Sequence, residues 1–468
     1  MKNYISDTFA FSTDASVLLE AFAGEPYCFL LDSSLSDARR GRYSFFGFDP
    51  FDVYRHKNSG DLNPLRQAFE RYQFINETQD VLPAGLVGFL AYDHGLFQEK
   101  IPLHAKDDLD LPDCLFGFYD CILSVDHVAQ TMTICSSGYP EQAPERRLRR
   151  AHERLDYARE KLERLRPDVE NLPAAPPDPV SGQLDWQGNF TRQGYERAVG
   201  LALEHIAAGD IYQVNLSQRF SLPFTGDAQS RRLYHLLRGY SPSHFGVYFD
   251  GGDYQLISSS PERYLQLRGQ KLLTQPMKGT RPRGANPEED QRYREEILHS
   301  GKEQSELLMI TDLERNDLGR VCEFGSVKVL QQRVIEQYTT VYQAISTVEG
   351  TLQADKDCFD ILKACFPGGS ITGCPKIKAM QIIEELEPTR RSIYTGAFGY
   401  ISFNGNMDFN IMIRTILATQ DHYHVQVGAG IVAESTPEAE YAETLVKAQA
   451  MQACLEALKK TAEPGRAR

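Results

Sequence analysis

The sequence predicts an α+β fold in which large antiparallel β-sheets pack face to face, with helices outside. The first 140 residues consist mostly of short strand-like segments separated by Gly and Asp-Pro turns. Residues 397–432 form a second strand-rich stretch, a predicted β-meander with a strong hairpin signal at Asn404-Gly405. Segments between these two stretches carry the capping residues that begin and end helices.

Composition sets the class of protein. A chain of 468 residues has room for two or three domains and a large core. Its formal net charge of −14 argues against nucleic acid or an acidic membrane as a partner. The nine cysteines are scattered without a C-x-x-C pair, and no signal peptide or 18-residue apolar run is present, so we expect a cytoplasmic protein.

The N-terminal region, residues 1–166, is predicted to be β-rich. Four segments have strand character, with a helix expected near 64–72 and a charged amphipathic helix over 143–166. Residues 167–183 contain five prolines and little periodicity, which predicts a linker. The strand segments are 27–34, 42–50, 85–93 and 114–125.

The second region, residues 184–460, alternates helices and strands. Thr191 is a predicted N-cap for a helix that runs to Ala208, and a strand follows over 210–222. Asn286-Pro287 and Ser300-Gly301 mark the starts of two further helices, and Thr436-Pro437 starts a long C-terminal one. Further strands are expected at 245–249, 254–259 and 263–274.

One acid and one amine lie close together in sequence within this second region. Glu262 follows Pro261 on a tight turn, and Lys278 lies in a loop bounded by Pro276 and Gly279. A lysine held in a shaped loop can act as a nucleophile if burial or nearby cations lower its pKa. On this segment alone, a surface lysine in a basic loop is the simpler interpretation.

Two E-x-x-E pairs near helix starts suggest a metal site. Glu303 and Glu306 share one helix face, and Glu440 and Glu443 share another. Four pooled carboxylates repel one another unless a divalent cation lies between them, and hard oxygen ligands favour Mg²⁺. For either pair considered alone, a solvated acidic helix face is the commoner explanation.

A charged residue inside an apolar strand suggests an anion site. Arg414 interrupts the predicted strand NIMIRTIL, and a buried guanidinium needs an anionic partner. That partner is either a substrate carboxylate or a structural Asp or Glu. The Gly-rich loop at 366–376 is no Walker A motif, because Cys374 follows Gly373 where Lys is required.

Two motifs carry a family resemblance. Ser-Pro-Glu-Arg at 260–263 and Pro-Met-Lys-Gly-Thr-Arg-Pro-Arg-Gly at 276–284 resemble the chorismate-utilising enzymes, and further matches extend over about 195–458. The resemblance implies the fold of that family, with an N-terminal region of anthranilate synthase component I type. Anthranilate synthases typically carry Ala at the position of Lys278. The chain therefore resembles the component I chains of the aminodeoxychorismate synthases, which carry Lys there.

The resemblance also implies roles for site residues. Lys278 would add covalently to C2 of chorismate while Glu262 protonates the leaving C4 hydroxyl. Glu306 and Glu443 would bind Mg²⁺ directly, with Glu303 and Glu440 behind them through water. Arg414 would bind the enolpyruvyl carboxylate of chorismate. Other implied substrate-binding residues are Gly279, Thr280, Gly428, Ala429, Gly430 and Lys447.

The implied reaction gives 4-amino-4-deoxychorismate, a precursor of p-aminobenzoate and folate. No cysteine has a glutaminase-like Gly-x-Cys-x-Gly setting, so we expect a separate glutamine amidotransferase subunit to supply ammonia. Anthranilate synthase component I is the nearest alternative. Isochorismate and salicylate synthases are disfavoured by Gln213, where those enzymes carry a water-activating Lys. A catalytically inactive subunit that binds small anions is the alternative of another class.

Two further positions differ from relatives. Leu30-Leu31-Asp32-Ser33 resembles the Leu-Leu-Glu-Ser segment of the tryptophan pocket in anthranilate synthases, although a plain strand end is the simpler explanation. Gln343 stands where many relatives have His, so any role of that His does not carry over.

Overall fold

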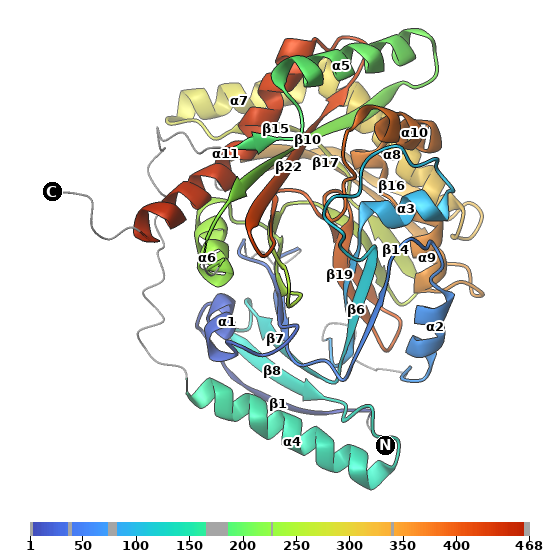
Figure 1. Cartoon of the computed structure of the whole chain (residues 1–468). Helices are drawn as coiled ribbons and strands as arrows, with labels where there is room; N and C mark the ends of the chain where they lie inside the picture. The colour runs from blue at the N-terminus through green and yellow to red at the C-terminus, as the bar shows by residue number, and fades with distance from the viewer. Residues whose placement is uncertain are drawn as a thin grey trace, which may run out of the picture.

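Two large antiparallel sheets pack face to face in the computed structural model, and helices cover their outer sides (Figure 1). The structure describes residues 3–35, 40–73, 82–164, 186–225, 228–337 and 341–462, apart from the side chains of 280, 302 and 460–462. The predicted fold class is confirmed. The predicted linker at 167–183 lies outside the described residues.

The first sheet has 12 strands, in the order β1-β8-β7-β3-β2-β11-β12-β21-β22-β10-β18, with β9 beside β10. Its strands are β1 (Ile5–Ala10), β2 (Phe29–Asp32), β3 (Tyr43–Gly47), β7 (Cys121–Asp126), β8 (Thr131–Ser136), β9 (Gln187–Gly188), β10 (Gln213–Pro223), β11 (Phe245–Asp250), β12 (Gln255–Ser260), β18 (Gly373–Cys374), β21 (Thr415–Ala418) and β22 (His422–Ile431).

The second sheet has 10 strands, in the order β15-β17-β14-β13-β20-β19-β5-β6-β4, with β16 beside β17. Its strands are β4 (Asp52–His56), β5 (Gly85–Leu90), β6 (Cys114–Tyr119), β13 (Arg263–Arg268), β14 (Lys271–Thr274), β15 (Met277–Pro282), β16 (Lys328–Gln337), β17 (Val341–Thr351), β19 (Ala397–Ser402) and β20 (Met407–Ile411).

Side-chain caps fix several helix starts at the predicted residues. The Thr191 hydroxyl accepts from the Gly194 amide, and Asn286 and Ser300 accept from the amides of Glu289 and Glu303. The helices are α1 (Leu18–Ala21), α2 (Asn63–Glu70), α3 (Tyr92–Gln98), α4 (Pro144–Glu163), α5 (Arg192–Ala207), α6 (Ser230–Tyr240), α7 (Pro287–His299), α8 (Gly301–Gly319), α9 (Cys358–Cys365), α10 (Lys376–Leu386) and α11 (Pro437–Ala462), with short 3₁₀ turns at Ala15–Val17 (η1) and Gly369–Ile371 (η3).

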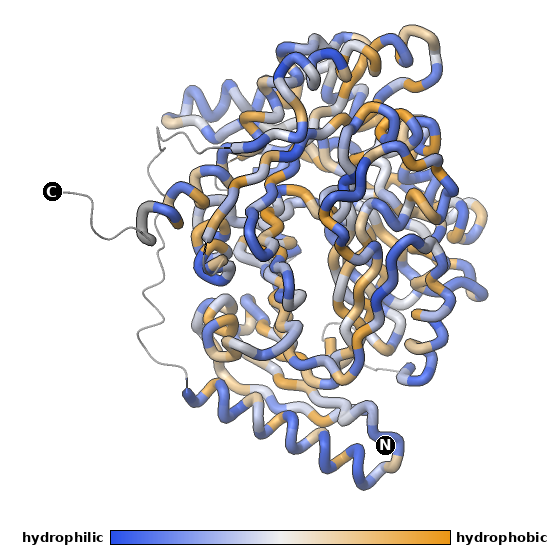
Figure 2. The backbone as a smooth tube through the Cα atoms, in the orientation of Figure 1, coloured by the Kyte–Doolittle hydropathy of each residue, from blue (hydrophilic) through white to orange (hydrophobic). Residues whose placement is uncertain are grey.

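Apolar residues gather where these elements pack together, as Figure 2 shows by the orange stretches along the strands. Polar residues dominate the outer helix α4, whose Leu155 and Ala158 face inward and are buried. Within the described parts of the chain, no helix has the length and apolar character needed to span a bilayer.

Both predicted regions contribute strands to both sheets. In the first sheet, β2 of the N-terminal region pairs with β11 of the second region. In the second sheet, β5 pairs with β19 in the same way. The two regions are therefore joined by continuous hydrogen-bonded ladders.

Three segments differ from the prediction, and at two of them the chain crosses from one sheet to the other. The expected strand at 114–125 is two strands, β6 and β7, in different sheets, and 263–274 is the hairpin β13–β14. The expected meander at 397–432 is also divided, because β19 and β20 belong to the second sheet and β21 and β22 to the first. Arg414 lies in the bend between β20 and β21, not inside a strand.

Candidate active site

Two neighbouring crossings bring Glu262 and Arg414 toward each other. Glu262 lies between β12 and β13, and Arg414 lies between β20 and β21. The Ile411 amide donates to the Glu262 carbonyl (3.1 Å), and the Ser260 hydroxyl donates to the Ile411 carbonyl, so the two crossings are hydrogen-bonded together. Arg414 has a φ of 51°, a left-handed conformation that is uncommon outside Gly and often accompanies functional positions.

The surroundings of the Glu262 carboxyl favour its protonated form. Glu262 is 4% exposed, and the Ser370 hydroxyl donates to its Oε1 (2.7 Å). Burial raises the pKa of Glu262 to about 7, while the Ser370 bond and the positive charges of Lys278 and Arg414 act in the opposite direction. A carboxyl with this pKa can donate a proton near neutral pH.

Lys278 lies on a strand, not in the predicted loop. It belongs to β15, which pairs with β17, and the register shifts between Lys278 and Thr280. Gly279, between them, has a φ of 81°, and a Cβ there would lie 2.7 Å from Glu303 Oε2. Gly279 therefore permits the bulge that sets the direction of the strand around Lys278.

The Lys278 amine lies among both acidic and basic side chains. Burial lowers the pKa of Lys278, and Lys447 acts in the same direction, whereas Glu306, Glu262 and Glu443 act to raise it. A Cβ on Gly430 would lie 3.4 Å from Lys278 Nζ, so the amine approaches the backbone of β22. Together these interactions bring the amine of Lys278 close to the carboxyl groups of Glu262, Glu306 and Glu443.

Protein side chains contact the glutamates expected at a metal. Glu303 Oε1 accepts from Arg281 (2.8 Å), Glu443 pairs with Lys447 (2.8 Å), and Glu440 accepts from the Ser435 hydroxyl (2.6 Å). Among the described side chains, no three His, Cys, Asp or Glu are grouped closely enough to hold a metal ion. The expected pooling of four carboxylates into one group is thus not present, and the metal site stays a prediction.

The residues present still have the chemistry that Mg²⁺ requires. Glu303 Oε2 is buried and has no hydrogen-bond partner among the described residues. Glu306 and Glu443 both act on Lys278, so hard oxygen donors face one region from α8 and α11. A cation that keeps most of its water ligands and takes one or two carboxylates fits this donor set.

The predicted anion-binding residues near the C-terminus lie on β22 and α11. Gly428, Ala429 and Gly430 are in β22, paired with β10. Lys447 donates to the Gly428 carbonyl (2.8 Å), so the lysine is tied to this strand. The Thr280 side chain lies outside what the structure describes.

Three further buried residues complete the site. Ser370, in the Gly-rich loop at 366–376, donates its hydroxyl to Glu262. Gln213 is buried next to Gly430, and Gln343 is buried opposite Thr280 on β17. The Oε1 atoms of both glutamines have no hydrogen-bond partner among the described residues, which is unusual for buried amides and typical of sites that bind ligands.

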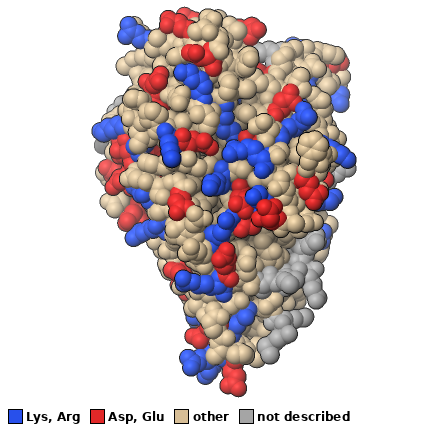
Figure 3. Space-filling model, turned by 90° about the vertical axis from the view of Figure 1, so that its right-hand side faces the viewer, with Lys and Arg blue, Asp and Glu red and all other residues tan. Residues whose placement is uncertain are grey.

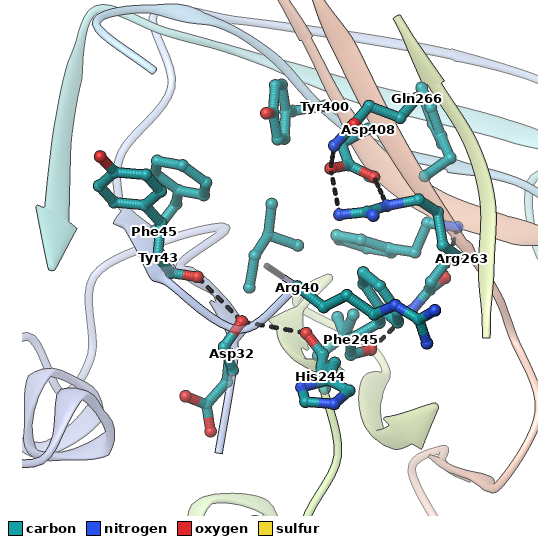
Figure 4. A pocket seen from close by; sticks show the side chains of 18 of the residues that line it. Asp32, Arg40, Tyr43, Phe45, His244, Phe245, Arg263, Gln266, Tyr400 and Asp408 are labelled. Atoms are coloured by element: carbon teal, nitrogen blue, oxygen red, sulfur yellow. Dashed lines mark hydrogen bonds and ion pairs between the residues drawn. The ribbon is translucent and has the colours of Figure 1, made fainter. Parts of the chain in front are cut away.

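The segment that resembles a tryptophan pocket does line a cavity. Leu31, Asp32 and Ser33 line a cavity of about 330 Å³, drawn in Figure 4 with Arg263 and Asp408 paired in its wall. The Asp32 carboxylate, however, accepts from Tyr234 (2.8 Å) and Arg238 (2.5 Å) and is fully buried. The Asp32 carboxylate is therefore already hydrogen-bonded to protein side chains.

Charge is mixed on one face of the molecule. On the face drawn in Figure 3, Lys and Arg alternate with Asp and Glu, and no broad area of one sign is visible.

A family model described as "chorismate binding enzyme" matches residues 28–453. Among similar proteins, anthranilate synthase component 1 of Thermus thermophilus is 39% identical over 462 residues, covering 96% of both chains. Aminodeoxychorismate synthase component 1 of Bacillus subtilis is 38% identical over 442 residues, covering 90% of this chain and 91% of that one.

Solved structures agree with the fold. Anthranilate synthase component I from Streptococcus pneumoniae superposes with a TM-score of 0.77 at 32% identity, covering 89% of this chain and 93% of that one. The menaquinone-specific isochorismate synthase of Escherichia coli gives a TM-score of 0.73 at 18% identity, covering 97% and 94%, a likeness of fold alone.

Proposed function

Because this chain belongs to the chorismate binding enzyme family, we propose that it is an aminodeoxychorismate synthase component I. It would convert chorismate and ammonia to 4-amino-4-deoxychorismate. The observation that carries the proposal is Lys278, whose amine lies near Glu262, Glu306 and Glu443 and has a lowered pKa. Relatives of both kinds are about equally similar overall, so the proposal depends on this one position, where the chain resembles the aminodeoxychorismate synthases.

Hydroxide is a poor leaving group, so the first step needs an acid. The neutral Lys278 amine bonds to C2 of chorismate, both ring double bonds shift by one position, and the C4 hydroxyl leaves as water with the proton of Glu262. In the second step ammonia bonds to C4, both double bonds shift back, and the bond between C2 and Lys278 breaks. The proton that the incoming nitrogen loses restores Glu262.

Other residues would orient the substrate. The Arg414 guanidinium would hold the enolpyruvyl carboxylate by parallel hydrogen bonds, and Lys447 would add positive charge. Mg²⁺, when bound, would neutralise the ring carboxylate, with Glu306 and Glu443 as its direct protein ligands and Glu303 and Glu440 behind them through water. Gly279, Thr280 and the backbone of Gly428, Ala429 and Gly430 would shape the remaining contacts.

Ammonia would come from a separate glutamine amidotransferase subunit. The relatives at 39% and 38% identity are both called component 1, which supports a second component. The purified chain is expected to consume chorismate with Mg²⁺ and ammonium salts but not with glutamine. Glutamine-dependent turnover by the chain alone would contradict this part of the proposal.

Product identity tests the reaction itself. Chorismate incubated with the chain, Mg²⁺ and ammonium should give 4-amino-4-deoxychorismate without releasing pyruvate, as followed by mass spectrometry and a coupled pyruvate assay. Anthranilate together with pyruvate would instead establish the anthranilate synthase alternative, which the 39% identical relative favours. No consumption of chorismate under either condition would support an inactive binding subunit.

Metal dependence gives a separate prediction. Chelation should abolish chorismate turnover, and added Mg²⁺ should restore it. Glu306→Gln removes one predicted ligand charge, so the Mg²⁺ concentration for half-maximal activity should rise at least about tenfold. Direct binding of Mn²⁺, measured by electron paramagnetic resonance, should weaken in parallel. Glu295→Gln on the exposed face of α7 is the control, and equal effects of the two substitutions would contradict the ligand assignment.

A further inference from the structure

Arg391 and Glu387 form a buried ion pair behind the site. The side chain of Arg391 is 1% exposed and that of Glu387 is 2% exposed, and Arg391 Nη2 lies 2.7 Å from Glu387 Oε1. Arg391 Nε also donates to this carboxylate, at 3.1 Å from Oε2. A charged pair at this depth is favourable only where its remaining donors and acceptors also have partners.

The partners of the Arg391–Glu387 pair lie on two other elements. Arg391 Nη1 donates to the Ile371 carbonyl in turn η3 (2.9 Å), and Nη2 donates to the Asn215 carbonyl in β10 (2.6 Å). Glu387 Oε1 accepts from both the backbone amide and the hydroxyl of Ser217, also in β10 (2.8 and 2.9 Å). The pair therefore ties η3 and β10 to the segment that follows α10.

Turn η3 carries the residue that contacts the acid of the site. Ser370, in the middle of the turn, donates its hydroxyl to Glu262 Oε1 (2.7 Å). Directly after the turn, the Thr372 carbonyl accepts from the Asn215 amide of β10 (2.7 Å). Arg391 bonds to carbonyls on both sides of this junction, so a movement of η3 relative to β10 would break its bonds and shift the Ser370 hydroxyl.

We propose that the Arg391–Glu387 pair positions the acid of the site: by joining η3 to β10, it holds the Ser370 hydroxyl on Glu262. Arg391 is thus a positioning residue that acts through Ser370. The inference rests on the proposed role of Glu262 as the acid in chorismate turnover. Orientation of the carboxyl matters because a small misplacement of a catalytic group can lower the rate by up to about 10²-fold.

A weaker Ser370 bond has a defined effect on Glu262. Burial raises the pKa of Glu262, and the Ser370 bond lowers it. Among charged groups, Lys278 on β15 and Arg414 between β20 and β21 also lower it, and Glu314 on α8 is the neighbouring acid. Loss of the Ser370 bond therefore raises the pKa of Glu262, so the carboxyl keeps its proton to higher pH and the alkaline limit of turnover moves upward.

Arg391→Lys is the first test. Lysine keeps the positive charge beside Glu387, but its compact ammonium group cannot reach the carboxylate and both carbonyls together. We expect kcat for chorismate consumption, at constant free ammonia, to fall about tenfold while KM changes less than about twofold. The ionisation near pH 7 should move up by about 0.5 unit. An unchanged kcat and an unchanged ionisation would overturn the proposal.

Ser370→Ala shows whether Arg391 acts through Ser370. Ser370→Ala alone should move the ionisation upward, and the addition of Arg391→Lys should move it no further, because both changes remove one and the same interaction. Shifts that add in the double variant would overturn the proposal.

Arg154→Lys is the matched control. The Arg154 side chain is 12% exposed, forms an ion pair with Asp120 and donates to the Asp49 carbonyl (3.0 Å), so it has the same kinds of partner as Arg391. It belongs to α4, at the opposite end of the molecule from β15 (Figure 1). Arg154→Lys should leave kcat and the pH profile unchanged, and an effect equal to that of Arg391→Lys would overturn the proposal.

Infrared spectroscopy gives a readout that needs no substrate. The band lost in Glu262→Gln identifies the carbonyl stretch of protonated Glu262. A hydrogen bond to this carbonyl lowers its frequency, so the band should move to higher frequency in Arg391→Lys and in Ser370→Ala. An unmoved band in Arg391→Lys would overturn the proposal. A shifted band in a protein that does not consume chorismate would support the positioning of Ser370 and contradict only the proposed function.

A double variant keeps the test valid if Arg391→Lys does not fold. Glu387→Gln together with Arg391→Met replaces the ion pair by neutral side chains, an exchange that proteins often tolerate. This variant lacks the bonds to the Ile371 and Asn215 carbonyls and should show the same band shift as Ser370→Ala. A band at the wild-type frequency would overturn the proposal.

Discussion

Lys278→Ala is expected to abolish amination at C4 while the chain stays folded. The variant has no amine to bond to C2, so the two-step route cannot begin. Loss of a covalent nucleophile commonly lowers kcat on the order of 10⁴–10⁶-fold, and we expect a loss of this size for 4-amino-4-deoxychorismate formation. Product analysis from chorismate and ammonium measures it, with circular dichroism as the check on folding.

The control for Lys278→Ala is another lysine close in sequence. Lys271 on β14 has a side chain that is 73% exposed and forms one ion pair of 3.7 Å with Glu349. Lys271→Ala should retain full activity, because exposed pairs contribute little. Residual turnover by Lys278→Ala should show the amine at C2, since ammonia then adds directly. An unchanged product and rate in Lys278→Ala would exclude Lys278 from the mechanism.

Glu262→Gln is expected to lower kcat by about 10²–10⁴-fold, the usual contribution of a positioned acid. The amide can still accept from Ser370 but cannot deliver a proton to the leaving hydroxyl. In the wild-type enzyme Glu262 is about half protonated at pH 7 and nearly fully protonated below about pH 6, and its protonated fraction falls about tenfold for each unit above about pH 8. The rate, proportional to that fraction and to the neutral fraction of Lys278, should give a bell-shaped profile.

The decisive feature is the ionisation near pH 7. It should be absent from the pH profile of Glu262→Gln, because the group responsible has been removed. The measurement is chorismate consumption across pH at a fixed concentration of free ammonia. If the variant keeps both the rate and the ionisation, Glu262 is not the acid.

Local sequence signals predicted the helix starts well. Thr191, Asn286 and Ser300 cap their helices through their own side chains, and such contacts involve residues only three apart. The strand-rich character of residues 1–140 and 397–432 could also be predicted, because the alternation of apolar and polar residues and the turn residues are local signals. The confirmed fold class follows from these patterns.

The places where the chain crosses between the sheets could not be predicted from local sequence. Nothing local distinguishes a continuous strand at 114–125 from two strands in different sheets, because the break at Asp120 depends on partners far away in sequence. The conformation of Arg414 has the same origin, since its φ of 51° follows from the passage between β20 and β21. The contact between Ser370 and Glu262 could not be predicted either, because the two residues lie 108 positions apart in the sequence.

The shared ladders between the two regions constrain how the protein can be divided. Removal of residues 1–166 would take β2 away from β11 and β5 away from β19. The remaining chain would present two long rows of open backbone donors and acceptors at the centre of what were complete sheets. Such rows invite pairing between molecules and aggregation. The region that carries Glu262, Lys278 and Arg414 therefore depends on the N-terminal region for solubility as well as for its fold.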